Sequence, residues 1–182
     1  MSNPQPLYLG IDPGASGGIA VVTPAYFQDH GTTTSRAWPM PRDEEQMWKL
    51  VQGIRELGKI KAVALEQVGG YVQGSGGNIG SAMFTFGRNY EMPLMAVVAA
   101  GVPLASITKV HPHTWQRSYP RMPKREPGEQ PGAWKRRLKK HLKERAQKLF
   151  PGLKVTLATA DALLIALWGA SPVQPTKDRG GL

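Results

Sequence analysis

Three acidic residues, far apart in the sequence, each interrupt a stretch of otherwise apolar or small residues. Asp12 ends an apolar run and precedes a glycine-rich turn. Glu66 lies within the apolar run 62–68, and Asp161 lies near the start of the apolar run 159–169. Burying an ionised carboxylate is costly unless it is paired, protonated or bound to a cation. These three residues are therefore the first candidates for a functional site.

Each acid, taken alone, also has an ordinary structural explanation. Asp12 could hydrogen-bond its own backbone in the turn. Glu66 could point to water from an edge strand, and Asp161 could cap the N-terminus of a helix. The functional interpretation depends on all three meeting in space, because clustered carboxylates repel one another and need protons or cations between them.

The donor atoms of such a cluster limit the chemistry. An all-oxygen ligand set, in a chain without cysteine, suits Mg²⁺ or Mn²⁺. One ion would activate a water molecule and a second would stabilise the leaving oxygen of a phosphodiester. The sequence therefore predicts two ions per site and metal-assisted cleavage of a phosphodiester.

Hydrophobic spacing predicts the elements that must position these acids. Residues 7–22 form two short apolar runs around a turn of small residues, which predicts a β-hairpin with Asp12 on its first strand. The run 62–68 predicts a strand, and 159–169 predicts a buried helix with Asp161 in its first turn. The other predicted elements are an extended segment near a sheet edge over 37–41, helices over 43–57, 81–90 and 133–150, a continued apolar pattern over 93–101, and a strand over 104–110.

The formal net charge of +10 predicts an acidic partner, with nucleic acid as the first candidate. The predicted helix 133–150 is the most basic element, and Glu144 is its only acid. Like charges on adjacent turns repel, so bound phosphates would stabilise this surface. A helix screened by counterions alone is the alternative.

The length of 182 residues suits one domain with its own core. We expect a single domain over 1–170, a mobile basic loop over 118–132 and a flexible tail over 171–182. No apolar run is long enough to span a bilayer, and the N-terminal residues lack the pattern of a signal peptide. A cytoplasmic protein without a membrane partner is therefore expected.

The three acidic segments together resemble the signature blocks of RuvC-type Holliday-junction resolvases. The matching blocks are Gly10-Ile11-Asp12-Pro13-Gly14 with Gly17-Gly18, Ala64-Leu65-Glu66-Gln67-Val68, and Ala160-Asp161-Ala162-Leu163-Leu164-Ile165-Ala166. The likeness runs from about residue 7 to residue 170. It looks closest to the phage-bacterial and chloroplast branch, through the glycine-rich loop after Glu66 and the lysine-rich helix that leads to Pro151.

The resemblance implies an α/β, RNase H-like fold, with a mixed five-stranded sheet and helices on both faces. It also implies a homodimer that nicks two strands of like polarity at a four-way DNA junction, in a bacterium or a phage-infected cell. Asp12, Glu66 and Asp161 match the family's catalytic and metal-binding carboxylates. Lys139, with Lys135 as its rival, matches a lysine beside the scissile phosphate. The residues expected to contact branched DNA are Tyr71, which would stack on an opened base pair, Arg88, Arg117, Lys135, Arg136, Lys139, Lys140 and Lys143.

Two positions depart from the family's pattern. Ala158 stands where the family usually has a fourth metal ligand, Asp or His, one helical turn before the last Asp. Metal binding is then weaker, or another group completes the site, or the chain binds junctions without cleaving them. Gln116 stands where a family lysine precedes the mobile loop, and the neighbouring Arg117 could take over its phosphate contact.

Other functions are compatible with parts of the pattern. A relaxed nuclease for branched or flap DNA is the nearest enzymatic alternative. An ATPase of the actin and hexokinase type also begins with Asp-x-Gly, but it needs a second glycine-rich phosphate hairpin in a longer chain. No nucleotide cofactor is therefore expected.

Overall fold

The computed structural model describes residues 6–23, 35–67 and 79–171 of the chain. A five-stranded mixed sheet forms its centre, with the strand order β3-β2-β1-β4-β5. Strands β1 and β2 are antiparallel, as are β2 and β3, whereas β4 runs parallel to both β1 and β5. The strands are β1 (Pro6–Asp12), β2 (Gly18–Val22), β3 (Arg36–Pro39), β4 (Lys59–Glu66) and β5 (Ile107–Val110).

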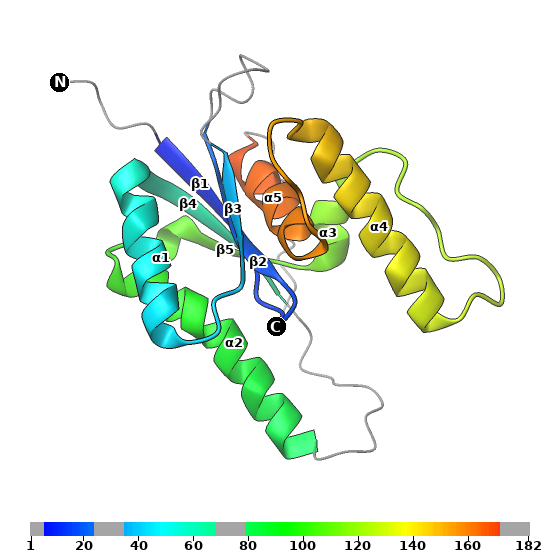
Figure 1. Cartoon of the computed structure of the whole chain (residues 1–182), viewed down its shortest axis with the longest axis horizontal. Coiled ribbons are helices and arrows are strands. Elements are labelled where there is room, and N and C mark those ends of the chain that lie inside the picture. Colours follow the sequence, from blue (N-terminus) through cyan, green and yellow to red (C-terminus); the bar gives the residue numbers. More distant parts are fainter. Residues whose placement is uncertain (1–5, 24–34, 68–78, 172–182) are drawn as a thin grey trace, which may run out of the picture.

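Helices cover both faces of this sheet (Figure 1). Helices α1 and α2 lie on one face, and α5 lies on the other, with α3 and α4 packed beside it. The helices are α1 (Glu44–Leu57), α2 (Ile79–Ala99), α3 (Pro112–Arg117), α4 (Pro131–Leu149) and α5 (Leu157–Ala170), and a short 3-10 turn spans Leu104–Ser106. The predicted α/β fold, a mixed five-stranded sheet with helices on both faces, is confirmed.

Alternation along β1 decides which residues face which layer, because successive side chains of a strand point to opposite faces. Leu7, Leu9 and Ile11 are fully buried in the core beneath α1 and α2. Gly10 and Asp12 therefore belong to the opposite face, where α5 lies. The predicted hairpin with Asp12 on its first strand is confirmed, and Asp12 pairs with Gly18 across it.

Two glycines let α5 lie directly on the sheet. A Cβ atom at Gly10 would stand 2.2 Å from both the carbonyl oxygen of Ala162 and the backbone nitrogen of Ala166. A Cβ at Gly18 would stand 2.6 Å from the carbonyl oxygen of Ala158. These contacts involve backbone atoms, which cannot rotate away, so glycine sets the depth at which the helix carrying Asp161 packs.

The predicted start of the last helix is wrong by two residues. The helix begins at Leu157, and its N-cap is Thr156, whose hydroxyl accepts a hydrogen bond from the Thr159 backbone while Thr159 bonds back to the Thr156 backbone. This reciprocal capping satisfies the free N–H groups of the first turn. Asp161 consequently lies in the second turn and does not cap the helix.

Other element boundaries also differ from the predictions. The first three residues of the predicted strand 104–110 form the 3-10 turn, and only Ile107–Val110 pairs in the sheet. The predicted strand 62–68 begins earlier, at Lys59, and its regular pairing ends with Glu66. The helix predicted over 81–90 and the apolar pattern over 93–101 form one helix, α2, which contains Pro93. The extended segment near a sheet edge, predicted over 37–41, is confirmed as the edge strand β3.

None of the helices within the described ranges combines the length and apolar character needed to cross a membrane.

Candidate active site

The C-terminal ends of β1 and β4 bring Asp12 and Glu66 together. Ile11 pairs with Leu65 in the parallel ladder, so Asp12 and Glu66 are the next residue on each strand. Ala64 packs in the core beneath α5, and by alternation Glu66 faces the same side. Because β4 lies between β1 and β5, Glu66 is not on an edge strand.

Asp161 completes the group from α5, which crosses this face of the sheet. All three acids are buried, with exposed fractions of 6% for Asp12, 7% for Glu66 and 4% for Asp161. They are close enough that the charges of Asp12 and Asp161 both act on the pKa of Glu66. The expectation that the three acids converge agrees with this arrangement.

Lys139 of α4 reaches the same place. Its Nζ lies 2.7 Å from Oδ2 of Asp161 and 3.5 Å from Oδ2 of Asp12, so one ammonium contacts acids from two different elements. Partial burial lowers the pKa of Lys139, but the carboxylates of Asp161 and Asp12 outweigh this effect and the pKa stands above its usual value. Lys139 is therefore charged throughout the physiological range. Its rival Lys135 forms no ion pair with either acid in the described part of the chain.

Glu66 is held by a residue that the sequence analysis did not single out. The indole Nε1–H of Trp115, which is fully buried, donates a hydrogen bond of 2.9 Å to Oε1 of Glu66. Burial, and to a smaller extent the charge of Asp12, raise the pKa of Glu66 from its usual 4.5 to about 7, while the Trp115 bond opposes the shift. The sequence offered one signal, since a buried tryptophan usually finds a partner for its N–H.

Asp161 and Asp12 differ in how their oxygens are satisfied. Burial raises the pKa of Asp161, and the contact with Lys139 counteracts part of that rise. Oδ1 of Asp161 is buried and has no hydrogen-bond partner among the residues that the structure describes. Oδ1 of Asp12 accepts a hydrogen bond of 3.2 Å from the Gly14 backbone N–H. Asp12 therefore makes the ordinary turn hydrogen bond of an aspartate and also belongs to the cluster of three acids.

The donor chemistry of this site fits a hard divalent cation. It offers carboxylate oxygens only, and one of them, Oδ1 of Asp161, is buried and unsatisfied. Within residues 6–23, 35–67 and 79–171, however, no three side chains of His, Cys, Asp or Glu are arranged as a complete metal ligand set. The ammonium of Lys139 lies between Asp12 and Asp161 instead.

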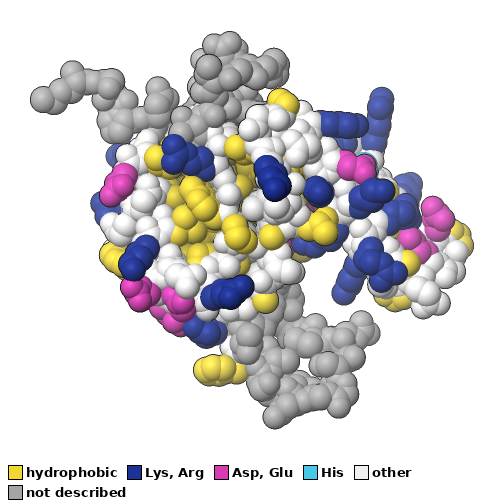
Figure 2. All heavy atoms as spheres, in the orientation of Figure 1, with side chains coloured by type: hydrophobic (Ala, Val, Ile, Leu, Met, Phe, Trp, Pro, Cys, Tyr) yellow, Lys and Arg dark blue, Asp and Glu magenta, His cyan; other side chains and the backbone are white. Residues whose placement is uncertain are grey.

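Beside the three acids, α4 presents a cationic surface. Figure 2 shows Lys and Arg side chains gathered over the region of α4. Lys135, Arg136 and Lys140 are exposed, and Lys143 is half-buried. Lys140 lies 4.0 Å from Glu144, whereas Arg137 is bound by Glu129 at 2.7 Å.

The remaining predicted DNA contacts lie elsewhere. Arg117 is exposed at the end of α3. Arg88 of α2 donates to both carboxylate oxygens of Glu44 at 2.8 and 2.9 Å, so an exposed ion pair already engages its charge. Tyr71 lies outside the described residues. Contact of these residues with DNA stays a prediction.

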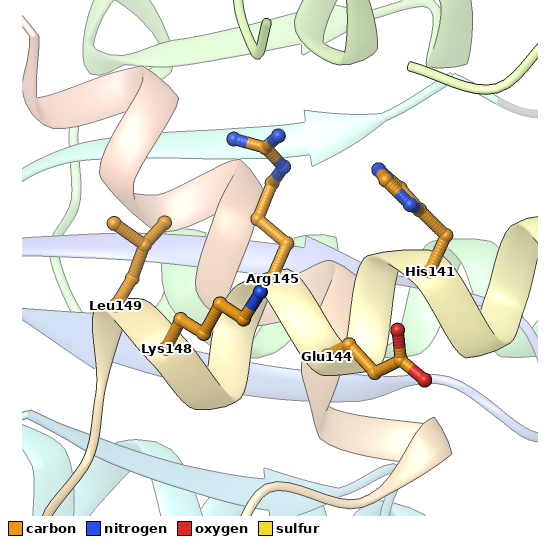
Figure 3. Close-up of a pocket in the computed structure, with 5 residues that line it drawn as sticks. All are labelled: His141, Glu144, Arg145, Lys148 and Leu149. Carbon is orange, nitrogen blue, oxygen red and sulfur yellow. The ribbon is translucent and has the colours of Figure 1, made fainter. Parts of the chain in front are cut away.

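A small pocket on α4 lies apart from the catalytic candidates. It has a volume of about 170 Å³ and is lined by His141, Glu144, Arg145, Lys148 and Leu149. Figure 3 shows the side chains of His141 and Arg145 projecting from the same side of the helix. Nε2 of His141 and Nε of Arg145 are buried, and neither has a hydrogen-bond partner within the described part of the chain. None of the three clustered acids lines the pocket, so it is not part of the acidic site.

Comparison with known proteins adds a structural relationship. No protein-family model matches the sequence, and no curated protein matches it. Among solved structures, Thermus thermophilus RuvC in complex with a Holliday junction substrate aligns with 88% of this chain and 90% of its own, at 17% identity and a TM-score of 0.54. A second Thermus thermophilus RuvC structure aligns with 88% of this chain and 91% of its own, at 19% identity and a TM-score of 0.49. By the first of these alignments, the chain shares the fold of a RuvC-type resolvase over 88% of its length.

Proposed function

We propose that this protein is a divalent-metal-dependent endodeoxyribonuclease that resolves four-way DNA junctions. The observation that carries the proposal is the convergence of three buried acids, Asp12, Glu66 and Asp161, with the half-buried Lys139 of the cationic helix α4. The shared fold supports it, since the similar Thermus thermophilus protein was solved with a Holliday junction substrate.

In this function the three acids would hold Mg²⁺ or Mn²⁺. A bound divalent ion supplies a water molecule of lowered pKa and positive charge for the reacting phosphate. Lys139 places a permanent ammonium beside Asp12 and Asp161, where it can stabilise negative charge on a phosphate oxygen. Trp115 fixes the orientation of Glu66, and the α4 surface binds the DNA backbone through Lys135, Arg136, Lys140 and Lys143.

A homodimer is part of the proposal, because paired nicks in a four-way junction need two active sites. Exposed apolar side chains on α2 support an interface there: Phe84 is 77% exposed and Met95 is 57% exposed. Large apolar side chains exposed on one helix are typical of interaction surfaces. The mass in solution, measured by light scattering with and without junction DNA, tests this part.

The central experiment is a nicking assay on a labelled four-way junction with Mg²⁺ or Mn²⁺, with a linear duplex of the same sequence as the control. We expect symmetrical nicks in the junction and none in the duplex. Asp12→Asn, Glu66→Gln and Asp161→Asn should each reduce the cleavage rate. The reduction should exceed the roughly 10–100-fold loss that is typical when a residue that only orients a metal ligand is replaced. Junction affinity should stay near normal or rise, because each variant removes negative charge that faces DNA. Cleavage that persists in one variant would remove that residue from the mechanism.

A protein that binds junctions without cleaving them is the second candidate. Its support is specific: the turn of α5 before Asp161 provides Leu157, Ala158, Thr159 and Ala160, none of which is a carboxylate or an imidazole. Tight junction binding without nicks at any Mg²⁺ or Mn²⁺ concentration would favour this candidate. Equal cutting of flaps, forks and four-way junctions would indicate a relaxed branch nuclease instead.

A further inference from the structure

The small pocket on α4, which we call the α4 pocket, is lined by two side chains that each bury an unpaired nitrogen atom. These atoms are Nε2 of His141 and Nε of Arg145, which form no hydrogen bond within the described residues. Burying a polar atom without a partner is unfavourable, and a water molecule or an ion often supplies the partner. The α4 pocket has a volume of about 170 Å³, whereas a water molecule takes up about 30 Å³ of the liquid. It therefore has room for a group of several heavy atoms.

The charges around the α4 pocket favour an anion. Arg145 and Lys148 bring two positive charges, and Glu144 is the only acid among the described residues that line it. Figure 3 shows the carboxylate of Glu144 turned away from His141 and Arg145. Its Oε1 lies 4.0 Å from the ammonium of Lys140, which does not line the pocket. The lining thus carries an excess of positive charge.

The segment that follows α3 holds Arg145 in place. One Nη of Arg145 donates a hydrogen bond to the carbonyl oxygen of Pro120, and the guanidinium lies over the ring of Tyr119, 5.8 Å from its centre. These contacts engage Nη and the face of the guanidinium, but not Nε. An arginine that is already ordered loses less conformational freedom when it binds a ligand. Arg145 is therefore prepared to donate to an oxyanion.

The α4 pocket lies on a different side of the helix from the contact with the acidic site. Side chains three or four positions apart share one side of a helix, whereas those two positions apart do not. His141, Arg145 and Lys148 follow the first spacing. Lys139, which contacts Asp161 at 2.7 Å, comes two positions before His141. A ligand in the α4 pocket consequently does not occupy the acidic site.

We propose that the α4 pocket binds a phosphate group, separately from the phosphate that would react at the acidic site. His141 and Arg145 donate hydrogen bonds to its oxygens, and Lys148 adds positive charge. Arginine suits this ligand because its charged N–H groups match the geometry of phosphate oxygens. The group belongs either to the DNA backbone or to free phosphate and phosphorylated small molecules. Only the first of these sources rests on the proposed function.

Nuclear magnetic resonance of the His141 ring tests this site without DNA and without activity. Protein labelled at its histidine nitrogen atoms is titrated with inorganic phosphate at constant pH and ionic strength, and sodium chloride is the control salt. The loss of one signal in His141→Gln identifies His141. We expect this signal to shift with phosphate and to saturate. Arg145→Gln should weaken the phosphate affinity by about tenfold or more, because it removes a hydrogen bond to a charged group.

Lys154→Gln is the matched control, since Lys154 is exposed and does not line the α4 pocket. It should keep the phosphate affinity of the wild type. Circular dichroism checks the folding of Arg145→Gln, because Arg145 also contacts Pro120. If that variant does not fold, Lys148→Gln replaces it, since Lys148 is exposed. Lys148→Gln should weaken the phosphate affinity several-fold by removing one positive charge.

Gel-shift titrations with junction DNA distinguish the two sources of the phosphate group. If the group belongs to the DNA backbone, Arg145→Gln and Lys148→Gln should lower junction affinity, and Lys154→Gln should not. A saturable response to phosphate with unchanged junction affinity in both pocket variants would identify free phosphate or a phosphorylated small molecule as the ligand.

The phosphate titration decides the proposal by itself. No shift of the His141 signal, or an equal shift with chloride, would overturn it, and so would equal phosphate affinity in the wild type and both pocket variants. A chain that responds to phosphate but neither binds nor nicks junctions would reject the proposed function and leave the phosphate site standing. Efficient nicking by a chain without this response would reject the phosphate site alone.

Discussion

Trp115 donates its indole N–H to Oε1 of Glu66 across 2.9 Å, although the two residues are separated by 49 positions in the sequence. Both side chains are buried, so the bond is shielded from water. It links α3 to the end of β4 and opposes the rise in the pKa of Glu66 that burial and Asp12 cause. Glu66 is thus kept closer to the ionised form that a metal ligand needs.

Trp115→Phe should therefore weaken the site as well as the fold. Phenylalanine keeps most of the buried ring but removes the donor, so the pKa of Glu66 should rise further and Mn²⁺ affinity near neutral pH should fall. Loss of a hydrogen bond to a charged group should cost about 1.5–3 kcal/mol of stability above the pKa of Glu66. Urea unfolding and Mn²⁺ titration measure the two effects.

Trp48→Phe, at a tryptophan of α1 that is 42% exposed, is the matched control. Equal losses in both variants would argue against the role of the hydrogen bond.

Gly10→Ala should be strongly destabilising, because the new Cβ would meet backbone atoms of Ala162 and Ala166 at 2.2 Å. Overpacking of a core typically costs about 1–3 kcal/mol, and here α5 would have to move away from the sheet together with Asp161. Metal affinity should therefore fall with stability. Gly53→Ala in α1 is the opposite control, since no atom lies within 4 Å of its added Cβ. That change should stabilise the helix by about 0.5–1 kcal/mol. A Gly10→Ala variant as stable as the wild type would contradict the close packing.

Local patterns were sufficient to predict the hairpin, the strand with Glu66 and the buried helix with Asp161. Their alternation and order along the chain also indicated that the acids could meet. Two contacts of the site depend on how the elements pack together, and local sequence patterns could not predict them. Lys135 and Lys139 lie one helical turn apart on the same side of α4, so only the angle and depth at which α4 packs beside α5 select Lys139 for contact with Asp161. The bond from Trp115 to Glu66 spans elements whose packing no local pattern specifies.

The start of α5 shows a different limit. Thr156 and Thr159 form a reciprocal cap, but the usual sequence signature of such a cap ends in Glu or Gln. The predicted helix begins at Thr159, two residues after its actual start at Leu157, and Asp161 is for that reason expected in the first turn and found in the second. The nearly uniform apolar character of this helix gave no periodicity from which its first residue could be fixed.

Without metal, stability should fall as pH rises from 4.5 towards 7, because of Glu66. Its pKa is about 7 in the folded protein and 4.5 in an unfolded chain, so between these values the folded state holds a proton that the unfolded state has lost. Stability then decreases with rising pH, by roughly 3 kcal/mol across the window. The raised pKa of Asp161 acts in the same direction. Urea unfolding at several pH values in the presence of a chelator measures the slope. Glu66→Gln should flatten it, and parallel curves for the two proteins would rule out Glu66 as its source.

Junction affinity should fall steeply with salt, because binding to a cationic helix releases counterions from DNA. Replacing Lys135, Arg136 or Lys143 with Gln should each reduce the slope of log affinity against log salt by about 0.9 if that residue contacts one phosphate. Gel-shift titrations on the four-way junction at several salt concentrations provide the slope. Lys49→Gln on α1, where Lys49 is paired with Glu45 at 2.6 Å and lies on the opposite face of the sheet, should leave it unchanged. If all three α4 variants gave the wild-type slope, α4 would not be the DNA-binding surface, and the cationic charge of this helix would need another explanation.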